Sequence, residues 1–226
     1  MEKLRIVTID GPVASGKTAV GRALALRLAC RFLDTGLMYR AITWKAVQDE
    51  INPADEVALQ RLAEECDIQV LYDDPRRERV FLDTENVTDV LREAAVERCV
   101  SLVSSVPGVR RALVAQQRRM AAEGVMVVVG RDIGTVVLPN ALLKVYLEAS
   151  VEERAHRRHS EMIAQGQGTG YKKVFEALEL RDRVDSQREY SPLRPAKDAS
   201  RVDTDDLTVE EVVERIMELW RQCDCG

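Results

Sequence analysis

Aromatic residues are scarce in this chain, because Phe, Trp and Tyr together make up only 4 % of its 226 residues. Leu, Val, Ile and Ala must therefore fill the core, and a chain of this length can bury one without disulfides or metal ions. The 12 glycines and 7 prolines are too few for a collagen-like or low-complexity protein. With 46 % hydrophobic and 31 % charged residues, the composition is that of a soluble globular protein of one or two domains.

Long apolar runs and paired cysteines are also absent. No stretch approaches the roughly 20 apolar residues of a membrane span, and Asp10 interrupts the first apolar run well short of a signal-peptide core. The five cysteines are odd in number and contain no Cys-x-x-Cys pair, which favours a reducing compartment. We therefore expect a cytoplasmic protein that has no membrane partner.

The chain also lacks a basic excess, since its formal net charge is -5 at pH 7. Nucleic acids and anionic membranes attract surfaces that are basic over a whole domain, so we expect neither as a partner. An anionic ligand must instead be met by a local cluster of basic side chains.

Short apolar runs alternate with helical patterns through most of the chain, which is typical of a parallel α/β fold. We expect strands at 4–10, 32–34, 125–129, 142–149 and 200–203. We expect helices at 18–29, 37–49, 89–105 and 109–123, the last two separated by a break at Pro107 and Gly108. Capping boxes at Ser150–Glu153 and Thr208–Glu211 predict two further helices that start near 151 and 209.

Two segments differ from this pattern. Residues 67–87 alternate in hydrophobicity on both sides of a DDPRR turn, which predicts a small antiparallel insertion of two strands. Residues 165–173, QGQGTGYKK, are rich in glycine and lie between two highly charged helical segments. We interpret this stretch as a hinge or as the tip of a lid.

A phosphate-binding loop is the strongest single motif. GPVASGKT at 11–18 matches G-x-x-x-x-G-K-[ST] and lies between a buried strand and a helix, where its backbone N–H groups and the helix dipole can hold phosphates. Lys17 would reach the β- and γ-phosphates, and Thr18 would bind Mg²⁺. The residues that we expect to contact ATP here are Gly11, Pro12, Val13, Ala14, Ser15, Gly16, Lys17, Thr18 and Ala19.

Arginines gather in several places in spite of the acidic net charge. Two groups have the spacing of one helix face: Arg154 with Arg157 and Arg158, and Arg181 with Asp185 and Arg188. Taken alone, these groups are equally well explained as solvated stripes paired with neighbouring acids. Phosphoryl transfer, however, needs arginines that stabilise the charge of the transition state, and a mobile segment that excludes water.

Five motifs in a fixed order carry a family resemblance. They are GPVASGKT, LDTGLMYR at 33–40, GRDIGTVVLPNA at 130–141, SVEERAHRR at 150–158 and RDRVDSQRE at 181–189. Over nearly its whole length the chain resembles the bacterial cytidylate kinases, which are nucleoside monophosphate kinases of the P-loop class. The resemblance implies transfer of the γ-phosphate of ATP, with Mg²⁺, to CMP or dCMP, with UMP a poorer acceptor, by a monomer.

The same resemblance implies a fold and a domain division. The fold is a five-stranded parallel P-loop sheet flanked by helices, with an inserted antiparallel monophosphate-binding domain and a short helical lid. The core covers 1–36, 106–153 and 189–226, the monophosphate-binding domain covers 37–105, and the lid covers 154–188.

Site residues follow from matching positions. Arg131 and Arg40 resemble the clamp on the acceptor phosphate, Arg181 and Asp185 the ribose contacts, and Arg157 a lid arginine that reaches toward the transferred phosphoryl group and ATP. The remaining positions resemble residues that surround the cytosine: Thr35, Ser101, Arg110, Asp132 and Arg188. Catalysis would rest on Lys17, Arg131 and Arg157.

Two positions depart from the family pattern. Val129 is apolar where an acidic residue is common, so that a carboxylate role beside Arg131 or Mg²⁺ would pass to Asp132. Thr35 replaces serine but keeps the hydroxyl. Two other functions stay open from the residues: a P-loop kinase of another acceptor such as AMP, shikimate or gluconate, and a nucleotide-dependent regulatory switch. The absence of an Asn-Lys-x-Asp guanine motif weakens the switch.

Overall fold

The structure is a computed structural model that describes residues 4–74, 77–122, 124–164, 166 and 168–224. The chain divides into two compact units. The first contains Met1–Ala29 and Val127–Gly226, and the second contains Cys30–Met126. Within the described residues, no helix combines the length and the apolar character needed to cross a membrane.

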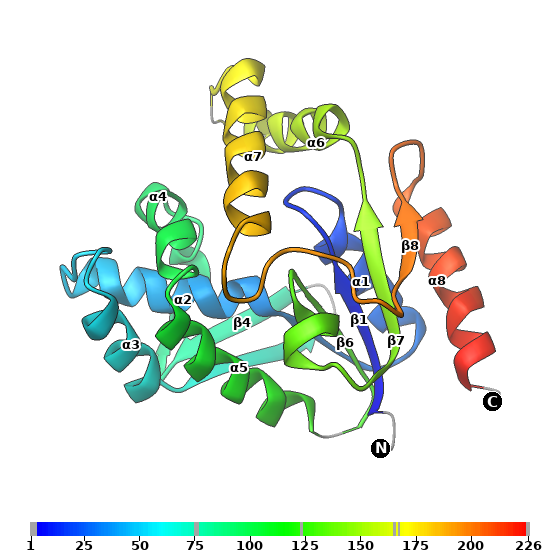
Figure 1. Ribbon diagram of the computed structural model, residues 1–226, viewed down its shortest axis with the longest axis horizontal. Coiled ribbons are helices and arrows are strands. Elements are labelled where there is room, and N and C mark those ends of the chain that lie inside the picture. Colours follow the sequence, from blue (N-terminus) through cyan, green and yellow to red (C-terminus); the bar gives the residue numbers. More distant parts are fainter. Residues whose placement is uncertain (1–3, 75–76, 123, 165, 167, 225–226) are drawn as a thin grey trace. The chain divides into compact units, whose positions relative to one another are not determined.

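Five strands form the main sheet, in the order β2-β6-β1-β7-β8. Figure 1 labels β6, β1, β7 and β8 of this sheet. They are β1 (Leu4–Asp10), β2 (Arg31–Asp34), β6 (Met126–Gly130), β7 (Ala141–Glu148) and β8 (Ser200–Asp203). β1 pairs in parallel with β7, and β7 pairs in parallel with β8. The predicted five-stranded parallel sheet flanked by helices is thus confirmed.

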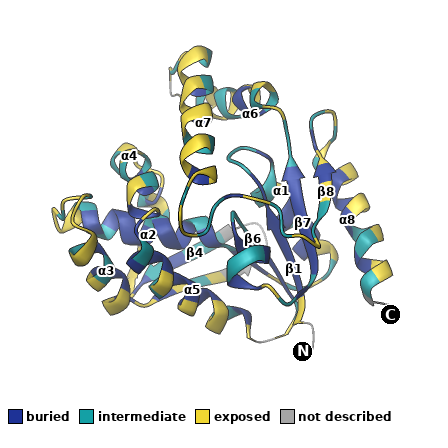
Figure 2. Cartoon of the chain, viewed as in Figure 1, coloured by how far each residue is buried: buried dark blue, intermediate teal, exposed yellow. Residues whose placement is uncertain are grey.

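Burial explains why these strands read as nearly continuous apolar runs. Ile6, Val7 and Ile9 of β1 are fully buried, and most of β7 is buried as well (Figure 2). A parallel strand that is covered on both faces has no solvent-facing side to alternate toward.

The described residues of the first unit form the α-helices α1 (Lys17–Arg27), α6 (Val151–Ala164), α7 (Tyr171–Ser186) and α8 (Val209–Asp224). Both predicted capping boxes bear on their starts. The Ser150 hydroxyl accepts the Glu153 N–H at 3.2 Å. At Thr208 the box is reciprocal: the hydroxyl accepts the Glu211 N–H at 3.3 Å, and the Glu211 carboxylate accepts the Thr208 N–H at 2.8 Å. The helix starts predicted near 151 and 209 are therefore confirmed.

In the second unit, the described residues form β2, further α-helices and a small sheet. The helices are α2 (Thr35–Gln48), α3 (Glu56–Glu65), α4 (Ala94–Val103) and α5 (Pro107–Ala121), and the strands are β3 (Ile68–Asp74), β4 (Arg77–Leu82) and β5 (Glu85–Asn86). α2 packs against α4, and α3 packs against α5. The predicted antiparallel insertion is confirmed, but it has a third strand, because the chain turns again at Asp83 and β5 pairs with β4. Residues 75–76 of the DDPRR turn lie outside the described residues.

Three sequence expectations need correction. α3 was not predicted, although Asp55 caps it by accepting the Ala58 N–H at 3.0 Å. Pro107 does not break a helix but stands at the first turn of α5, where its missing N–H costs nothing. The glycine-rich stretch ends at Gly170, because Tyr171 already begins α7. Its residues 165 and 167 lie outside the described residues.

The cap of α2 provides a stability test. Asp34 accepts the Gly36 N–H at 2.9 Å, which satisfies one of the donors that a helix start leaves open. We expect Asp34→Ala to lower the free energy of unfolding by about 1 kcal/mol, measured by urea unfolding. Asp34→Asn keeps the accepting oxygen and should stay close to wild type. Equal losses in both variants would rule out the cap as the source.

Candidate active site

The phosphate loop joins β1 to α1 and depends on glycine at its first residue. A side chain at Gly11 would place its Cβ 2.4 Å from the Leu147 carbonyl oxygen and 2.9 Å from the Ser15 hydroxyl. Only glycine can therefore start the turn this close to β7. Gly16 caps α1 in the left-handed region, with φ of 87°, and the first turn of α1 carries no acidic residue. The helix dipole thus faces the loop without a competing negative charge.

Lys17 lies folded over this loop. Its Nζ donates to the Pro12 carbonyl and, at 3.2 Å, to the Ser15 hydroxyl. Thr18 follows it in the first turn of α1 and is half-buried. The predicted phosphate residues are therefore brought together around one loop, with Ala19 exposed on the same turn.

Asp10 stands at the end of β1, next to the phosphate loop. Its two carboxylate oxygens accept the backbone N–H groups of Ile133 and Gly134, each at 2.8 Å. Burial raises the pKa of Asp10 from its usual 3.8 to about 7. The two N–H groups and the charge of Lys17 act in the opposite direction, and the charge of Asp132 adds to the rise.

A buried carboxylate collects two of the predicted substrate arginines. Asp185 of α7 has a side chain that is 0 % exposed, and it forms ion pairs with Arg131 and Arg188. A buried charge is stable only when it is paired, so these three groups fix one another in place. Arg181 lies one helical turn before Asp185 on α7 and is half-buried.

The three arginines of α6 have different partners. Arg154 is buried, and its guanidinium bonds to the Asp182 carboxylate of α7 at 2.6 Å and to the Val13 carbonyl of the phosphate loop at 3.2 Å. Arg158 pairs with Glu161 at 2.8 Å. The three arginines do not act as one group, because Arg154 bonds to the phosphate loop and to α7.

Arg157 lies beside the phosphate loop. Its guanidinium pairs with Glu153 at 2.8 Å and donates to the Thr204 hydroxyl at 3.1 Å and to the Thr204 and Asp205 carbonyls. A side chain at Gly16 would come within 4.0 Å of its Nη1. The predicted lid arginine and the phosphate loop are thus neighbours.

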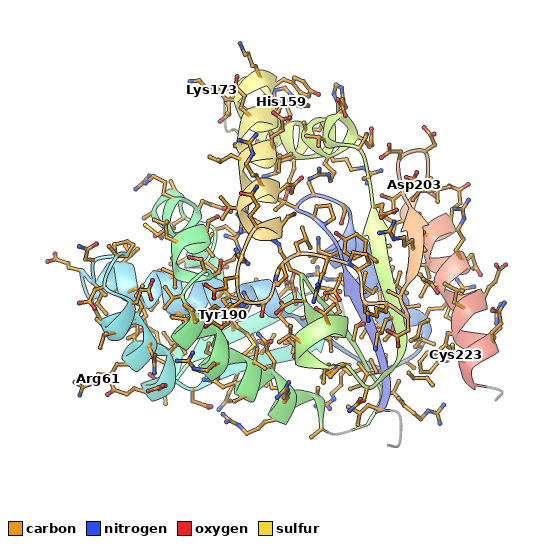
Figure 3. The ribbon with its side chains drawn as sticks, in the orientation of Figure 1. Arg61, His159, Lys173, Tyr190, Asp203 and Cys223 are labelled. Atoms are coloured by element: carbon orange, nitrogen blue, oxygen red, sulfur yellow. The ribbon has the colours of Figure 1, made fainter. Side chains whose placement is uncertain are left out.

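α6 and α7 form a hairpin with a small apolar core of its own (Figure 1). Ala155, Val174 and Leu178 are buried there, and Val13 of the phosphate loop packs against them. The loop is therefore joined to the hairpin through the side chain of Val13 as well as through its carbonyl. Figure 3 shows His159 and Lys173 at the outer end of this hairpin.

Both histidines of α6 pack against the ring of Tyr171. The rings of His156 and His159 lie 4.6 and 6.0 Å from the ring of Tyr171. Over the part of the chain that the structure describes, no three His, Cys, Asp or Glu side chains come together as a metal site.

Four predicted substrate residues belong to the second unit: Thr35, Arg40, Ser101 and Arg110. Arg40 of α2 donates through Nη1 to Glu97 at 2.9 Å and to the Leu91 carbonyl at 3.1 Å. Arg110 is buried, donates to the Ser104 carbonyl at 3.1 Å and lies over the Tyr39 ring, 5.3 Å from its centre.

Thr35 is buried at the start of α2, and Ser101 is half-buried in α4. The five other predicted substrate residues belong to the first unit: Arg131, Asp132, Arg181, Asp185 and Arg188.

Sequence reasoning missed three residues that shape the site. Asp10, Asp182 and Glu97 each accept from groups that the motifs contain or adjoin. The position of Asp10 at the end of a buried apolar strand could have indicated its role, since a buried carboxylate needs hydrogen-bond partners. Val129 is buried in β6, and Asp132 after it is buried as well.

A strand, a phosphate loop and a helix, with arginines held by carboxylates beside them, define a phosphotransferase of the P-loop class. The comparisons with known proteins agree. The family model described as cytidylate kinase matches residues 7–222. The chain belongs to the cytidylate kinase family.

Curated relatives cover nearly the whole chain. A cytidylate kinase of Geobacillus thermodenitrificans is 49 % identical over 97 % of both proteins. One of Carboxydothermus hydrogenoformans is 44 % identical over 94 % of this chain and 96 % of that protein. A bifunctional pantoate ligase/cytidylate kinase of Synechococcus is 47 % identical over 96 % of this chain and 41 % of its own length.

The raised pKa of Asp10 predicts how stability depends on pH. An acid whose pKa is higher in the folded state binds its proton more tightly there than in the unfolded chain. Asp10 should therefore make the free energy of unfolding fall as the pH rises from 3.8 to about 7, and contribute no further change above that.

Asp10→Asn cannot titrate, so urea unfolding of wild type and variant across this range isolates the effect. We expect wild type to lose stability relative to Asp10→Asn between pH 3.8 and about 7. Asp55→Asn, at a cap on the other unit, is the matched control. A wild-type stability that stays constant relative to Asp10→Asn would contradict the assignment.

Proposed function

We propose that this chain transfers the γ-phosphate of ATP to CMP or dCMP. A phosphate oxygen of the acceptor attacks the γ-phosphorus in line. The bond from that phosphorus to the β–γ bridging oxygen breaks, and ADP leaves with the electron pair. The products are ADP and CDP or dCDP. The observation that supports this most is the gathering of Arg131 and Arg188 on buried Asp185, in the same unit as the phosphate loop.

This chemistry requires positioning rather than a general base from the protein, because the attacking phosphate oxygen is already ionised and has no proton to lose. Lys17 and Arg157 would stabilise the charge on the transferred group from the phosphate-loop side. Arg131 and Arg40 would hold the acceptor phosphate, since a planar guanidinium can bind it with two hydrogen bonds. Nε and Nη2 of Arg40 suit this role, because its contacts with the described residues all use Nη1.

Mg²⁺ fits the residues present. P-loop enzymes hold it through the Ser or Thr hydroxyl of the loop, a carboxylate and the nucleotide phosphates, so an all-protein cage is not required. The Thr18 hydroxyl, beside Lys17 in the first turn of α1, would be its protein ligand. When bound, Mg²⁺ neutralises charge that develops on the phosphates.

The remaining roles concern the nucleoside. Asp132 would accept from the exocyclic amine of cytosine, with Thr35, Ser101, Arg110 and Arg188 around the base. Arg181 and Asp185 would contact the ribose. We assign the monophosphate to residues 37–105 and a closing lid to 154–188, and we expect UMP to be a poorer acceptor. We further propose a monomer that works in the cytoplasm.

An acceptor panel tests the function. ADP release from Mg-ATP is measured with CMP, dCMP, UMP, AMP, GMP and shikimate, each against ATP alone. We expect strong turnover with CMP and dCMP and weaker turnover with UMP. Turnover with AMP or shikimate instead would overturn the base pocket, and nucleotide binding without any acceptor-dependent turnover would indicate a regulatory switch.

Lys17→Ala separates the phosphate loop from the acceptor site. We expect kcat to fall by about a hundredfold or more, the effect of removing a group that stabilises transition-state charge. CMP binding, measured by calorimetry, should be preserved. Lys45→Ala removes an exposed lysine paired with Asp49 and serves as control. Normal turnover by Lys17→Ala would show that the loop is wrongly assigned.

A further inference from the structure

Asp10 is a buried charged group that the proposed reaction does not use. It is 3 % exposed, and both its oxygens accept from one short segment, the π-helical turn Ile133–Val137 that follows β6. The donors lie 123 and 124 residues away in sequence. One side chain therefore joins the end of β1 to the segment after β6.

The turn also packs closely against β1 and β7 at Gly134. A Cβ at Gly134 would meet the Thr8 hydroxyl at 3.0 Å, Lys144 Cδ at 3.2 Å and the Asp10 carboxylate at 3.3 Å. Both the hydrogen bonds and the missing side chain thus set how close the turn comes to the sheet. A shift of a few tenths of an ångström would weaken both bonds.

The residues next to this turn connect the contact to function. Arg131 and Asp132 directly precede Ile133, and Arg131 pairs with buried Asp185. On its other side, Asp10 directly precedes Gly11, the first residue of the phosphate loop. The carboxylate therefore stands between the residues assigned to the acceptor and the loop assigned to ATP.

We propose that Asp10 is a positioning residue, which fixes Arg131 and Asp132 for the acceptor through the N–H groups of Ile133 and Gly134. The inference rests on the proposed assignment of Arg131 and Asp132 to CMP. Above a pH of about 7, where Asp10 is ionised, its carboxylate suits this task because it offers an acceptor to each N–H, and buried N–H groups have no water to replace it. An amide offers one acceptor and one donor, so it can satisfy only one of the two.

The phosphate loop has contacts of its own. Ser15 N–H donates to the Pro12 carbonyl at 3.4 Å, and Arg154 donates to the Val13 carbonyl. A change at Asp10 should therefore affect the acceptor more than ATP. This difference distinguishes a positioning residue from one that merely supports the fold.

The test measures CMP and ADP binding separately, by calorimetry, on three variants. Asp10→Asn leaves one N–H without an acceptor, and Gly134→Ala pushes the turn away with Asp10 unchanged. We expect both to weaken CMP binding by about tenfold, the effect of one unsatisfied buried group. ADP affinity should stay within about twofold. Adding Thr8→Ala to Gly134→Ala removes the shortest of the three contacts, that with the Thr8 hydroxyl, and should restore part of the CMP affinity.

Asp55→Asn, which alters a carboxylate that accepts an N–H in the other unit, is the matched control. Thermal unfolding verifies that each variant is folded. If Asp10→Asn does not fold, the comparison of Gly134→Ala with the Thr8→Ala, Gly134→Ala double variant tests the inference instead. Equal losses of CMP and ADP, or no loss of either, would overturn the inference. Arg131→Ala distinguishes the two proposals. If Arg131→Ala binds CMP as tightly as wild type, the acceptor assignment itself is refuted. If Arg131→Ala loses CMP affinity but Asp10→Asn does not, only the role of Asp10 is refuted.

Discussion

The pairing of each phosphate-site arginine with a carboxylate is the interaction on which this site depends. The chain carries a net charge of -5, so its overall electrostatic potential does not attract phosphates. It must instead hold a few arginine side chains in fixed positions. Asp185 does this for Arg131 and Arg188, and Asp182 does it for Arg154. Buried pairs of this kind are worth little to stability, yet breaking one leaves a costly lone charge. Their value lies in orientation.

The parallel sheet brings this arrangement about. The carboxyl ends of neighbouring parallel strands lie at one edge, where ligands of open α/β sheets bind. β1 ends in Asp10 and continues as the phosphate loop, and β7 leads into α6 with its arginines. Because α6 and α7 share their apolar core with Val13, the hairpin and the loop form one packed body. Membership of the cytidylate kinase family fits this construction, and the proposed acceptor chemistry uses it.

Local signals could be predicted from the sequence, and distant partners could not. The phosphate loop and the capping box at Thr208 are each defined by a few consecutive residues, so both can be predicted from the sequence. α3 does not stand out in the sequence even though Asp55 caps it, and Pro107 is ambiguous because a proline marks a helix start as well as a stop. The spacing of the arginines predicted helices, and these segments are α6 and α7. No pattern could show that Glu97 would hold Arg40 from another helix, because that contact depends on the packing of α2 against α4.

The central claim is that carboxylate-held arginines bind the phosphate of the acceptor. Calorimetric titration of CMP and of cytidine, which lacks the phosphate, into wild type and Arg131→Ala tests it most directly. The account predicts that Arg131→Ala weakens CMP by about tenfold or more, the range for a charged hydrogen-bonding group, and leaves the weaker affinity for cytidine unchanged. If CMP and cytidine weaken equally, or if neither changes, Arg131 does not hold the acceptor phosphate and the account is contradicted.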